Sequence, residues 1–171
     1  MSETWFKEES NWTTGLEGYK VYRCDRKERI GGGVAIWVTD SIASRESGDN
    51  KEGINEESVW VEIRDCKNSK ILEGCFYRAP GVKEEEEGGV HEELKRACGK
   101  GRVLIMGDFN LPGKDWVQEQ GKGRVDEDFL VLVQDCFLTQ FVDKPTRGSA
   151  VLDLLLSNDL NMGRRWRLGS I

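Results

Sequence analysis

Residues 103–110 read Val-Leu-Ile-Met-Gly-Asp-Phe-Asn, a short apolar run that ends abruptly in polar residues. Glycines and a proline bound this run, so we predict a buried strand. Side chains alternate along a strand, and continuation of the strand would point Asp108 and Asn110 one way and Phe109 the other. The pattern therefore predicts a carboxylate and a carboxamide side by side at a sheet edge, an arrangement suited to orienting a water and a phosphate.

The composition is that of one folded domain. The chain has 171 residues, which is enough for a hydrophobic core of its own. Charged residues make up 33% and apolar residues 37% of the chain, but six Trp and six Phe argue against disorder. No apolar run approaches the length of a membrane span, and the acidic residues 1–9 do not resemble a signal peptide. We therefore expect an intracellular protein, in the nucleus or the cytoplasm, with no membrane partner.

Charge and cysteine content exclude some classes of site. The net charge of −6 argues against a broad basic surface that binds nucleic acid indiscriminately, but it is compatible with an acidic nuclease whose metal ion offsets local negative charge. The five cysteines are scattered without a C-x-x-C pair, and only one histidine is present, so we expect reduced thiols and no zinc site. The cysteines are Cys24, Cys66, Cys75, Cys98 and Cys136.

The remaining pattern predicts many strands and few helices. We expect strands at 34–38, 58–64, 71–77, 138–142 and 150–156, in addition to the one that follows residue 102. The runs at 58–64 and 71–77 form an antiparallel hairpin across a polar turn. Helices are expected at 90–98, after a polar and flexible segment at 84–89, and at 126–136, where apolar residues follow a helical period.

Each candidate site residue also has an ordinary structural explanation. Asp108 and Asn110 suit a polar turn after a strand. Asp153 stands inside an apolar run. Either it is buried, which is costly for a carboxylate without a partner, or it lies on a strand face that is exposed to solvent. Tyr77 suits a half-buried aromatic at the rim of a sheet, and Glu3 suits a simple charge near the N-terminus.

Taken together, five short motifs resemble those of one family. In chain order they are Ser2-Glu3-Thr4-Trp5, Gly32-Gly33-Val34-Ala35, Phe76-Tyr77-Arg78-Ala79-Pro80, Met106-Gly107-Asp108-Phe109-Asn110 and Leu152-Asp153-Leu154-Leu155-Leu156. This order resembles the endonuclease/exonuclease/phosphatase superfamily, and most closely the endonuclease domain of LINE-type (non-LTR) retrotransposon polyproteins. The resemblance runs from Glu3 to about Met162, so we predict a partial domain at 1–162 and an irregular basic tail at 163–171.

The resemblance implies a fold and a reaction. The fold is α/β (α+β), a four-layer α/β/β/α sandwich of two mostly antiparallel sheets with outer helices. The reaction is phosphodiester cleavage of DNA with Mg²⁺ or Mn²⁺ and without a small-molecule cofactor. Such a cation neutralises charge that develops on phosphate oxygens, and it often needs only one or two protein carboxylates.

The resemblance also assigns roles to individual residues. Glu3 matches the metal-binding glutamate of the family. Asp108 matches the aspartate that activates or orients the attacking water, and Asn110 matches the asparagine that hydrogen-bonds the scissile phosphate. Tyr77 matches the tyrosine of the phosphate pocket, and Asp153 matches the aspartate that positions a catalytic histidine.

Two parts of the family pattern are absent from this sequence. The family carries an asparagine on a strand that precedes the glutamate, and a Ser-Asp-His motif on a last strand. The one histidine, His91, lies in or beside a predicted helix, and we interpret it as a surface residue. We therefore expect a domain truncated at both ends, whose activity is impaired or lost.

Three functions remain open from the sequence. The first is a metal-dependent, DNA-nicking endonuclease domain derived from a retrotransposon, and the second is a non-catalytic relic or binding module that keeps the fold. The third is a hydrolase of phosphoinositides, sphingolipids or messenger tails, which the LINE-like motifs around Tyr77 and Asp153 disfavour. Arginines 164, 165 and 167 around Trp166 suit contact with nucleic acid, but we favour a frayed terminus, because arginines at a chain end are common and unanchored. The oligomeric state is not indicated.

Overall fold

The computed structural model describes residues 1–2, 4–5, 15–25, 32–47, 57–65, 67–81 and 84–162. Within them the elements follow one another as β1 (Tyr19–Cys24), β2 (Val34–Thr39), β3 (Ser44–Glu46), β4 (Ser58–Arg64), β5 (Lys70–Tyr77), α1 (Glu84–Cys98), β6 (Val103–Asp108), β7 (Lys114–Asp115), β8 (Gln120–Gly121), α2 (Arg124–Asp135), β9 (Thr139–Gln140) and β10 (Asp153–Ser157). Neither of these helices is long and apolar enough to cross a membrane.

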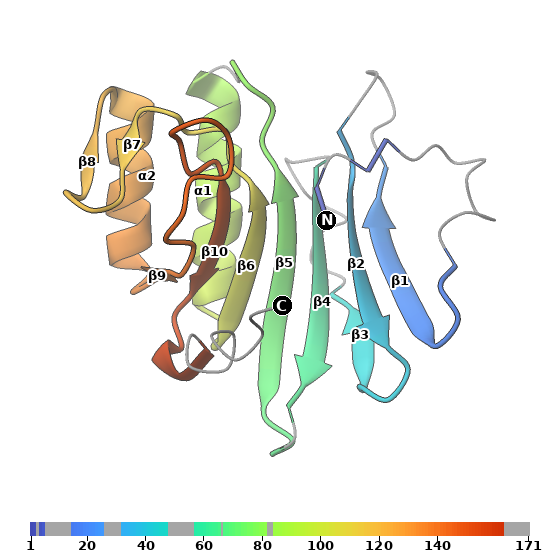
Figure 1. Ribbon diagram of the computed structural model, residues 1–171. Helices are drawn as coiled ribbons and strands as arrows, with labels where there is room; N and C mark the ends of the chain where they lie inside the picture. Colours follow the sequence, from blue (N-terminus) through green and yellow to red (C-terminus); the bar gives the residue numbers. More distant parts are fainter. Residues whose placement is uncertain are drawn as a thin grey trace.

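A six-stranded sheet with the order β3-β4-β5-β6-β10-β9 organises the fold. Neighbouring strands are antiparallel except β5 and β6, which run parallel and are connected through α1. A parallel pair needs such a crossover because its second strand must start again at the same edge of the sheet. As a result the C-terminal ends of β5 and β6 lie together, and the antiparallel β10 begins beside them (Figure 1).

Both helices cover one face of this sheet, and the largest hydrophobic cluster lies between them and the strands (Figure 1). Phe109 is fully buried in it, with its ring centroid 5.9 Å from that of Phe76 and 5.2 Å from that of Phe129. Burial of a phenylalanine side chain contributes about 1.5–3 kcal/mol. Phe109 therefore anchors the loop after β6 to the core, and with it the polar residues on either side.

The opposite face of the sheet packs against the antiparallel pair β1–β2. Val34 and Ile36 of β2 meet Val59 of β4 in a second hydrophobic cluster. The N-terminal segment extends this smaller sheet, because Ser2 forms an antiparallel bridge with Val34. The described residues thus form three layers of the predicted sandwich, one of helices and two of strands, and the helical layer outside the smaller sheet is not among them.

The predicted mixed α/β fold is confirmed, and most of its central elements are where the sequence pattern put them. The hairpin of residues 58–64 and 71–77 is β4–β5. The prediction of a flexible segment at 84–89 was wrong, because α1 already begins at Glu84. Acidic residues are compatible with the first turn of a helix, where the helix dipole is positive.

The last strand also starts later than predicted. β10 begins at Asp153, whereas the apolar run suggested a strand from Ala150. Residues 147–150 instead form a tight turn closed by a bridge between Arg147 and Ala150, and Gly148 takes φ +61° within it. Glycine adopts this left-handed conformation without the steric cost that other residues meet. β1 and β3 were not predicted, because β1 mixes polar and apolar residues without clear alternation and the three residues of β3 are all polar.

The described cysteines are free thiols, as predicted. Cys75 and Cys136 are buried, whereas Cys24 and Cys98 are half-buried. Burial, aided by the neighbouring Cys136, raises the pKa of the Cys98 thiol to about 12. Cys98 therefore stays protonated at neutral pH and is a poor nucleophile. Cys66 lies outside the described residues.

Gly107, just before Asp108, leaves no room for a side chain. Its φ is +149°, and a Cβ atom there would lie 1.9 Å from the Phe76 carbonyl oxygen. We predict that Gly107→Ala lowers the free energy of unfolding by at least about 3 kcal/mol, because β5 and β6 would have to separate. Gly88→Ala in α1 is the control, because nothing lies within 4 Å of its Cβ position and alanine favours a helix by about 0.5–1 kcal/mol. Urea unfolding compares the two, and equal stabilities would contradict the prediction.

Glu93 ties α1 to β4. Its Oε1 accepts hydrogen bonds from the Ser58 hydroxyl and the Trp60 indole N–H, each over 2.6 Å. We predict that Glu93→Ala lowers the free energy of unfolding by about 1–3 kcal/mol, because two donors lose their acceptor. Glu93→Gln keeps an oxygen at the same place, and its stability at pH 7 should match or exceed that of the wild type in the same urea titration.

The same carboxyl group gives the protein a defined pH dependence. Burial raises the pKa of Glu93, so the folded state takes up a proton at a higher pH than the unfolded state does. Stability should therefore increase as pH falls from the raised folded-state pKa toward the ordinary value of 4.5. Glu93→Gln should lack this increase in stability. Plots of stability against pH that run parallel for the two proteins between neutral pH and pH 4.5 would contradict the prediction.

Candidate active site

Three of the predicted site residues form one row across the six-stranded sheet. Asp108, at the end of β6, is the register partner of Tyr77 at the end of β5 and of Asp153 at the start of β10. Register partners project from the same face of a sheet. Tyr77 belongs to the cluster between the two sheets, so the row lies on the face away from the helices. The sheet thus brings together three residues that are far apart in the sequence.

Asp108 is the most buried member of the row, with 2% of its surface exposed. Its Oδ1 accepts a hydrogen bond from the Asn110 backbone N–H over 3.0 Å. Its Oδ2 lies 3.4 Å from Nη2 of Arg147, in the turn before β10. A buried carboxylate is stable only with such partners, because it loses its hydration. Asp108 is therefore held in a fixed orientation at the rim of the sheet.

Asn110 lies near Asp108 but not in the way that the sequence predicted. β6 ends at Asp108, and Asn110 takes φ +46°, so the expected continuation of the strand through residue 110 was wrong. The chain turns instead, which the Asn110 N–H bond to Asp108 stabilises as an Asx turn. The Asn110 side chain is 9% exposed, and its Nδ2 donates to the Arg78 carbonyl over 2.9 Å.

Arg78 is a residue of this site that the sequence did not reveal. It follows β5, is 8% exposed, and its backbone N–H donates to the Asp108 carbonyl over 2.8 Å. Its Nη1 donates to the carbonyls of Phe109 and Asn110, at 3.3 and 3.1 Å. Arg78 therefore clamps the turn after β6 from the neighbouring strand. A motif that includes Arg78 is present in the sequence, but nothing in it signals that this arginine is buried.

A tight turn carries Arg147 to the row. The N–H groups of Thr146 and Arg147 both donate to the Ala150 carbonyl, at 2.9 and 3.1 Å. The Thr146 hydroxyl oxygen accepts from the N–H groups of Leu152 and Asp153, at 3.0 and 3.1 Å. These bonds fix the start of β10, where Asp153 is exposed. Asp153 therefore follows the solvent-facing alternative rather than the buried one.

The other sequence candidates do not join this row among the described residues. Glu3 and the basic tail around Trp166 lie outside those residues. His91 sits on α1, where its ring centroid is 6.1 Å from that of Phe129 in the core on the helix side. The sheet therefore separates His91 from Asp108. The prediction that His91 is a surface residue was wrong, because the ring is half-buried against Phe129.

The donor atoms of the row suit a hard divalent cation. Tyr77, Asp108, Asn110 and Asp153 carry phenol, carboxylate and amide oxygens, and Mg²⁺ prefers oxygen ligands. The described part of the chain contains no group of three or more acidic, cysteine or histidine side chains that could enclose a metal ion. A cation held by one or two carboxylates, with waters and a substrate phosphate completing its shell, is compatible with this arrangement.

A groove of about 730 Å³ adjoins the site and is lined in part by Pro145 and Ala150 of the same turn. Lys114 on its wall is 9% exposed, and its Nζ lies 4.4 Å from the ring centroids of both Trp116 and Phe129. Burial lowers the pKa of Lys114 to about 7, so this amine is only partly charged at neutral pH. Lys114 therefore contributes less than a full positive charge to the groove at neutral pH.

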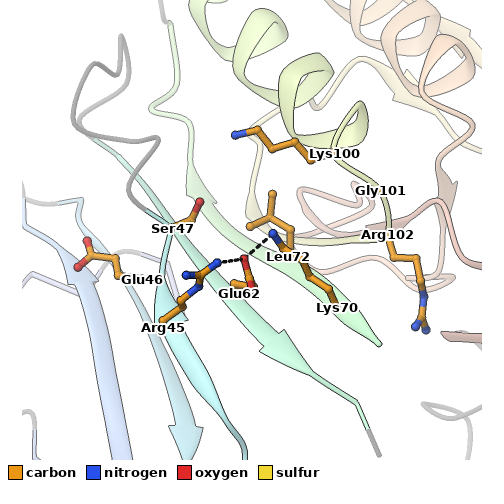
Figure 2. Close-up of a pocket in the computed structure, with 9 residues that line it drawn as sticks. All are labelled: Arg45, Glu46, Ser47, Glu62, Lys70, Leu72, Lys100, Gly101 and Arg102. Carbon is orange, nitrogen blue, oxygen red and sulfur yellow. Dashed lines mark hydrogen bonds and ion pairs between the residues drawn. The ribbon is translucent and has the colours of Figure 1, made fainter. Parts of the chain in front are cut away.

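A smaller pocket of about 290 Å³ lies at the opposite end of the sheet, where β5 begins (Figure 2). Figure 2 shows Glu62 between Arg45 and Lys70, and both cations hold the pKa of that carboxyl below its ordinary value. Arg102, also on the wall, binds two aspartates, Asp65 and Asp159. Because these charges neutralise one another, we assign this pocket no part in the chemistry predicted around Asp108.

Comparison with known proteins identifies the family. The profile of the Endonuclease/Exonuclease/phosphatase family matches residues 1–170. The chain therefore belongs to the endonuclease/exonuclease/phosphatase family, a family of phosphodiesterases and nucleases, as the sequence motifs predicted. No curated protein sequence matches the chain.

Solved structures share this fold at low sequence identity. The endonuclease domain of TRAS1, a telomere-specific non-LTR retrotransposon, has a TM-score of 0.64 at 18% identity and covers 84% of this chain and 66% of that one. ANGEL2, a 2′,3′-cyclic phosphatase, has a TM-score of 0.55 at 12% identity, with 91% and 67% covered. A family protein from Bacteroides thetaiotaomicron has a TM-score of 0.52 at 13% identity, with 82% and 61% covered. The chain thus spans about two thirds of these structures.

The Thr146 hydroxyl offers a test of how the site is positioned. We predict that Thr146→Val lowers the free energy of unfolding by about 1 kcal/mol, because two backbone N–H groups at the start of β10 lose their acceptor. Thr146→Ser keeps the hydroxyl and should stay within about 0.5 kcal/mol of the wild type. Amide hydrogen exchange at Leu152 and Asp153 should accelerate in the valine variant only, and unchanged exchange there would count against this role.

Proposed function

We propose that this chain is the DNA-cleaving part of a metal-dependent endonuclease derived from a non-LTR retrotransposon, a hydrolase of phosphodiester bonds. The observation that carries the proposal is the row of Tyr77, Asp108 and Asp153, with Asn110 on the adjoining turn. Family membership supports a phosphodiesterase or nuclease, and the fold is shared with the TRAS1 endonuclease domain. What we propose beyond family membership is that the substrate is DNA and that cleavage depends on a metal ion.

In this proposal Asp108 takes up the proton of the attacking water or orients that water. Its burial and its fixed hydrogen bond from Asn110 keep Oδ2 directed at the rim of the sheet. Such preorganisation matters because a general base must lie within hydrogen-bond reach of the proton that it removes. Asn110 donates a hydrogen bond from Nδ2 to a scissile phosphate oxygen after this group exchanges the Arg78 carbonyl for the substrate.

Tyr77 and Asp153 complete the phosphate pocket on either side of Asp108. The Tyr77 phenol can donate a hydrogen bond to a phosphate oxygen, and Asp153, which is exposed, can accept one from a protonated group at the leaving-group side. Glu3 is the proposed protein ligand of a Mg²⁺ or Mn²⁺ ion. When bound, such an ion offsets the negative charge that develops on the phosphate oxygens during hydrolysis.

DNA is the substrate that the resemblance favours over other phosphodiesters. The TRAS1 protein is described as a telomere-specific non-LTR retrotransposon endonuclease, whereas ANGEL2 is described as a 2′,3′-cyclic phosphatase. The motifs around Tyr77 and Asp153 resemble those of LINE-type endonucleases, which supports the first of these substrate classes. The fold alone is compatible with both.

One observation favours a second candidate, a binding module that holds DNA without cutting it. His91 is the sole histidine of the sequence and packs on the helix side of the sheet, away from the row. A site that lacks an imidazole lacks one source of acid–base and electrostatic catalysis, each worth several orders of magnitude in rate. DNA binding without metal-dependent nicking would select this candidate.

Replacement of Asp108 tests the proposal directly. We predict that the wild type nicks supercoiled plasmid only with Mg²⁺ or Mn²⁺, and that Asp108→Asn lowers the nicking rate at least about 100-fold, because the base is lost while the Asn110 bond is kept. Asp40→Asn, at the exposed turn after β2, removes the same charge elsewhere and should leave the rate unchanged. Conversion of supercoiled to open-circular plasmid on a gel measures the rate.

Two results would contradict the endonuclease proposal. One is nicking that persists in EDTA or in the Asp108→Asn variant, which would indicate a contaminating nuclease. The other is wild-type protein that remains folded and binds DNA but cuts neither DNA nor 2′,3′-cyclic phosphates with either metal.

A further inference from the structure

Arg147 combines two properties that set it apart in the site. Its Nη2 lies 3.4 Å from Oδ2 of Asp108, yet 60% of its side chain is exposed to solvent. The carboxylate that it reaches is almost completely covered. The guanidinium therefore spans from the most buried acid of the row to the outer surface, along the route by which a phosphate would approach.

The backbone under Arg147 is fixed although its side chain is exposed. Arg147 and Ala150 are joined by two backbone hydrogen bonds, of 3.1 and 3.0 Å, across a two-residue turn. Thr146 fastens the same turn to Leu152 and Asp153. Because Asp153 is the register partner of Asp108, the turn is anchored to the row itself. The backbone that carries Arg147 is thus fixed beside Asp108 and Asp153.

The ion pair with Asp108 is suited to exchange. The contact of 3.4 Å is longer than a well-formed charge-assisted hydrogen bond, and the guanidinium side of the pair is open to solvent, so another anion can reach Arg147 without entering the protein interior. A guanidinium forms paired, parallel hydrogen bonds with a phosphate, which match its planar shape better than one carboxylate oxygen does. A phosphodiester that enters the site therefore competes effectively for Arg147.

The neighbouring cations are less suited to this task. Arg78 is 8% exposed, and its Nη1 already donates to two carbonyl groups of the turn after β6. Lys114 is 9% exposed between two aromatic rings, and burial leaves it only partly charged at neutral pH. Arg78 and Lys114 are therefore engaged inside the protein, whereas most of the Arg147 side chain is exposed to solvent.

We propose that Arg147 is a substrate-binding residue that pairs with Asp108 in the free protein and transfers to a DNA phosphate when the substrate binds. This inference rests on the proposed function in that the ligand is DNA. The transfer frees Oδ2 of Asp108 at the moment when a water has to be oriented there. Until then Arg147 occupies the carboxylate, so the site is covered when no phosphate is present.

Three variants separate this role from general charge effects. Arg147→Gln removes the cation, and Arg147→Lys keeps the charge but loses the planar fork. Arg45→Gln is the matched control, because Arg45 is also exposed (74%) and paired with a carboxylate, Glu62, at the opposite end of the sheet. Arg147→Gln and Arg45→Gln change the net charge equally, so any difference between them reports position.

Binding of a fluorescein-labelled 20-base-pair duplex, without divalent metal, gives the first readout. We expect Arg147→Gln to weaken binding about tenfold and to lower the slope of log affinity against log salt by about 1, the change expected for one lost phosphate contact. Arg147→Lys should fall between Arg147→Gln and the wild type. Arg45→Gln should leave the affinity within about twofold. Circular dichroism verifies that each variant is folded.

The nicking assay gives the second readout. Arg147→Gln should raise the plasmid concentration needed for half-maximal rate, and Arg45→Gln should leave it unchanged.

The outcomes distinguish this inference from the proposed function. A wild type that binds duplex DNA but does not nick it removes the endonuclease proposal, while a selective loss of affinity in Arg147→Gln still supports the phosphate contact. Equal affinities and salt slopes for Arg147→Gln and Arg45→Gln overturn the inference even if nicking is robust. A wild type that binds no duplex at low salt overturns it as well.

Discussion

A carboxylate with 2% exposure governs the architecture of this site. Transfer of a charged group from water into a protein interior is costly, so Asp108 has to be supplied with partners by the surrounding backbone. The turn after β6 provides one such partner, through the Asn110 N–H, and the turn before β10 provides another, through Arg147. Each of these two turns is hydrogen-bonded to a neighbouring strand. The positions of the polar residues at the rim are therefore fixed, as are those of the core residues beneath them.

The register of three strands gives this rim its chemical identity. Parallel pairing of β5 with β6 and antiparallel pairing of β10 with β6 bring one phenol and two carboxylates into a single row. Phe109 holds the adjoining loop from the helix side, and Arg78 clamps it from β5. The polar row and the aromatic core are therefore opposite faces of one short segment. Substitutions in either are expected to disturb the other.

The central strands and the site residues were accessible from sequence, but the local geometry was not. Continuous apolar runs identified β2 and β6, because buried strands select such residues. Alternation identified β4, and the polar turn between β4 and β5 identified their hairpin. The left-handed conformation of Asn110 escaped notice, because alternation was assumed to continue past Asp108. Arg78 and Arg147 escaped notice for a related reason: whether an arginine is buried or paired depends on residues from other strands, which a one-dimensional pattern does not reveal. Glu3 remains a sequence-based assignment, outside the described residues.

The order of the strands along the chain has a consequence for biosynthesis. β10 inserts next to β6, although it is made after both helices and after β9. A ribosome-bound chain that has emerged only as far as α2 therefore presents β6 as an unpaired edge, and Asp108 still lacks Arg147. Contacts between distant segments form slowly because a long loop must close first. The nascent chain consequently passes through a stage in which a sheet edge is open to other polypeptides, and the arrival of β10 both covers that edge and assembles the polar row.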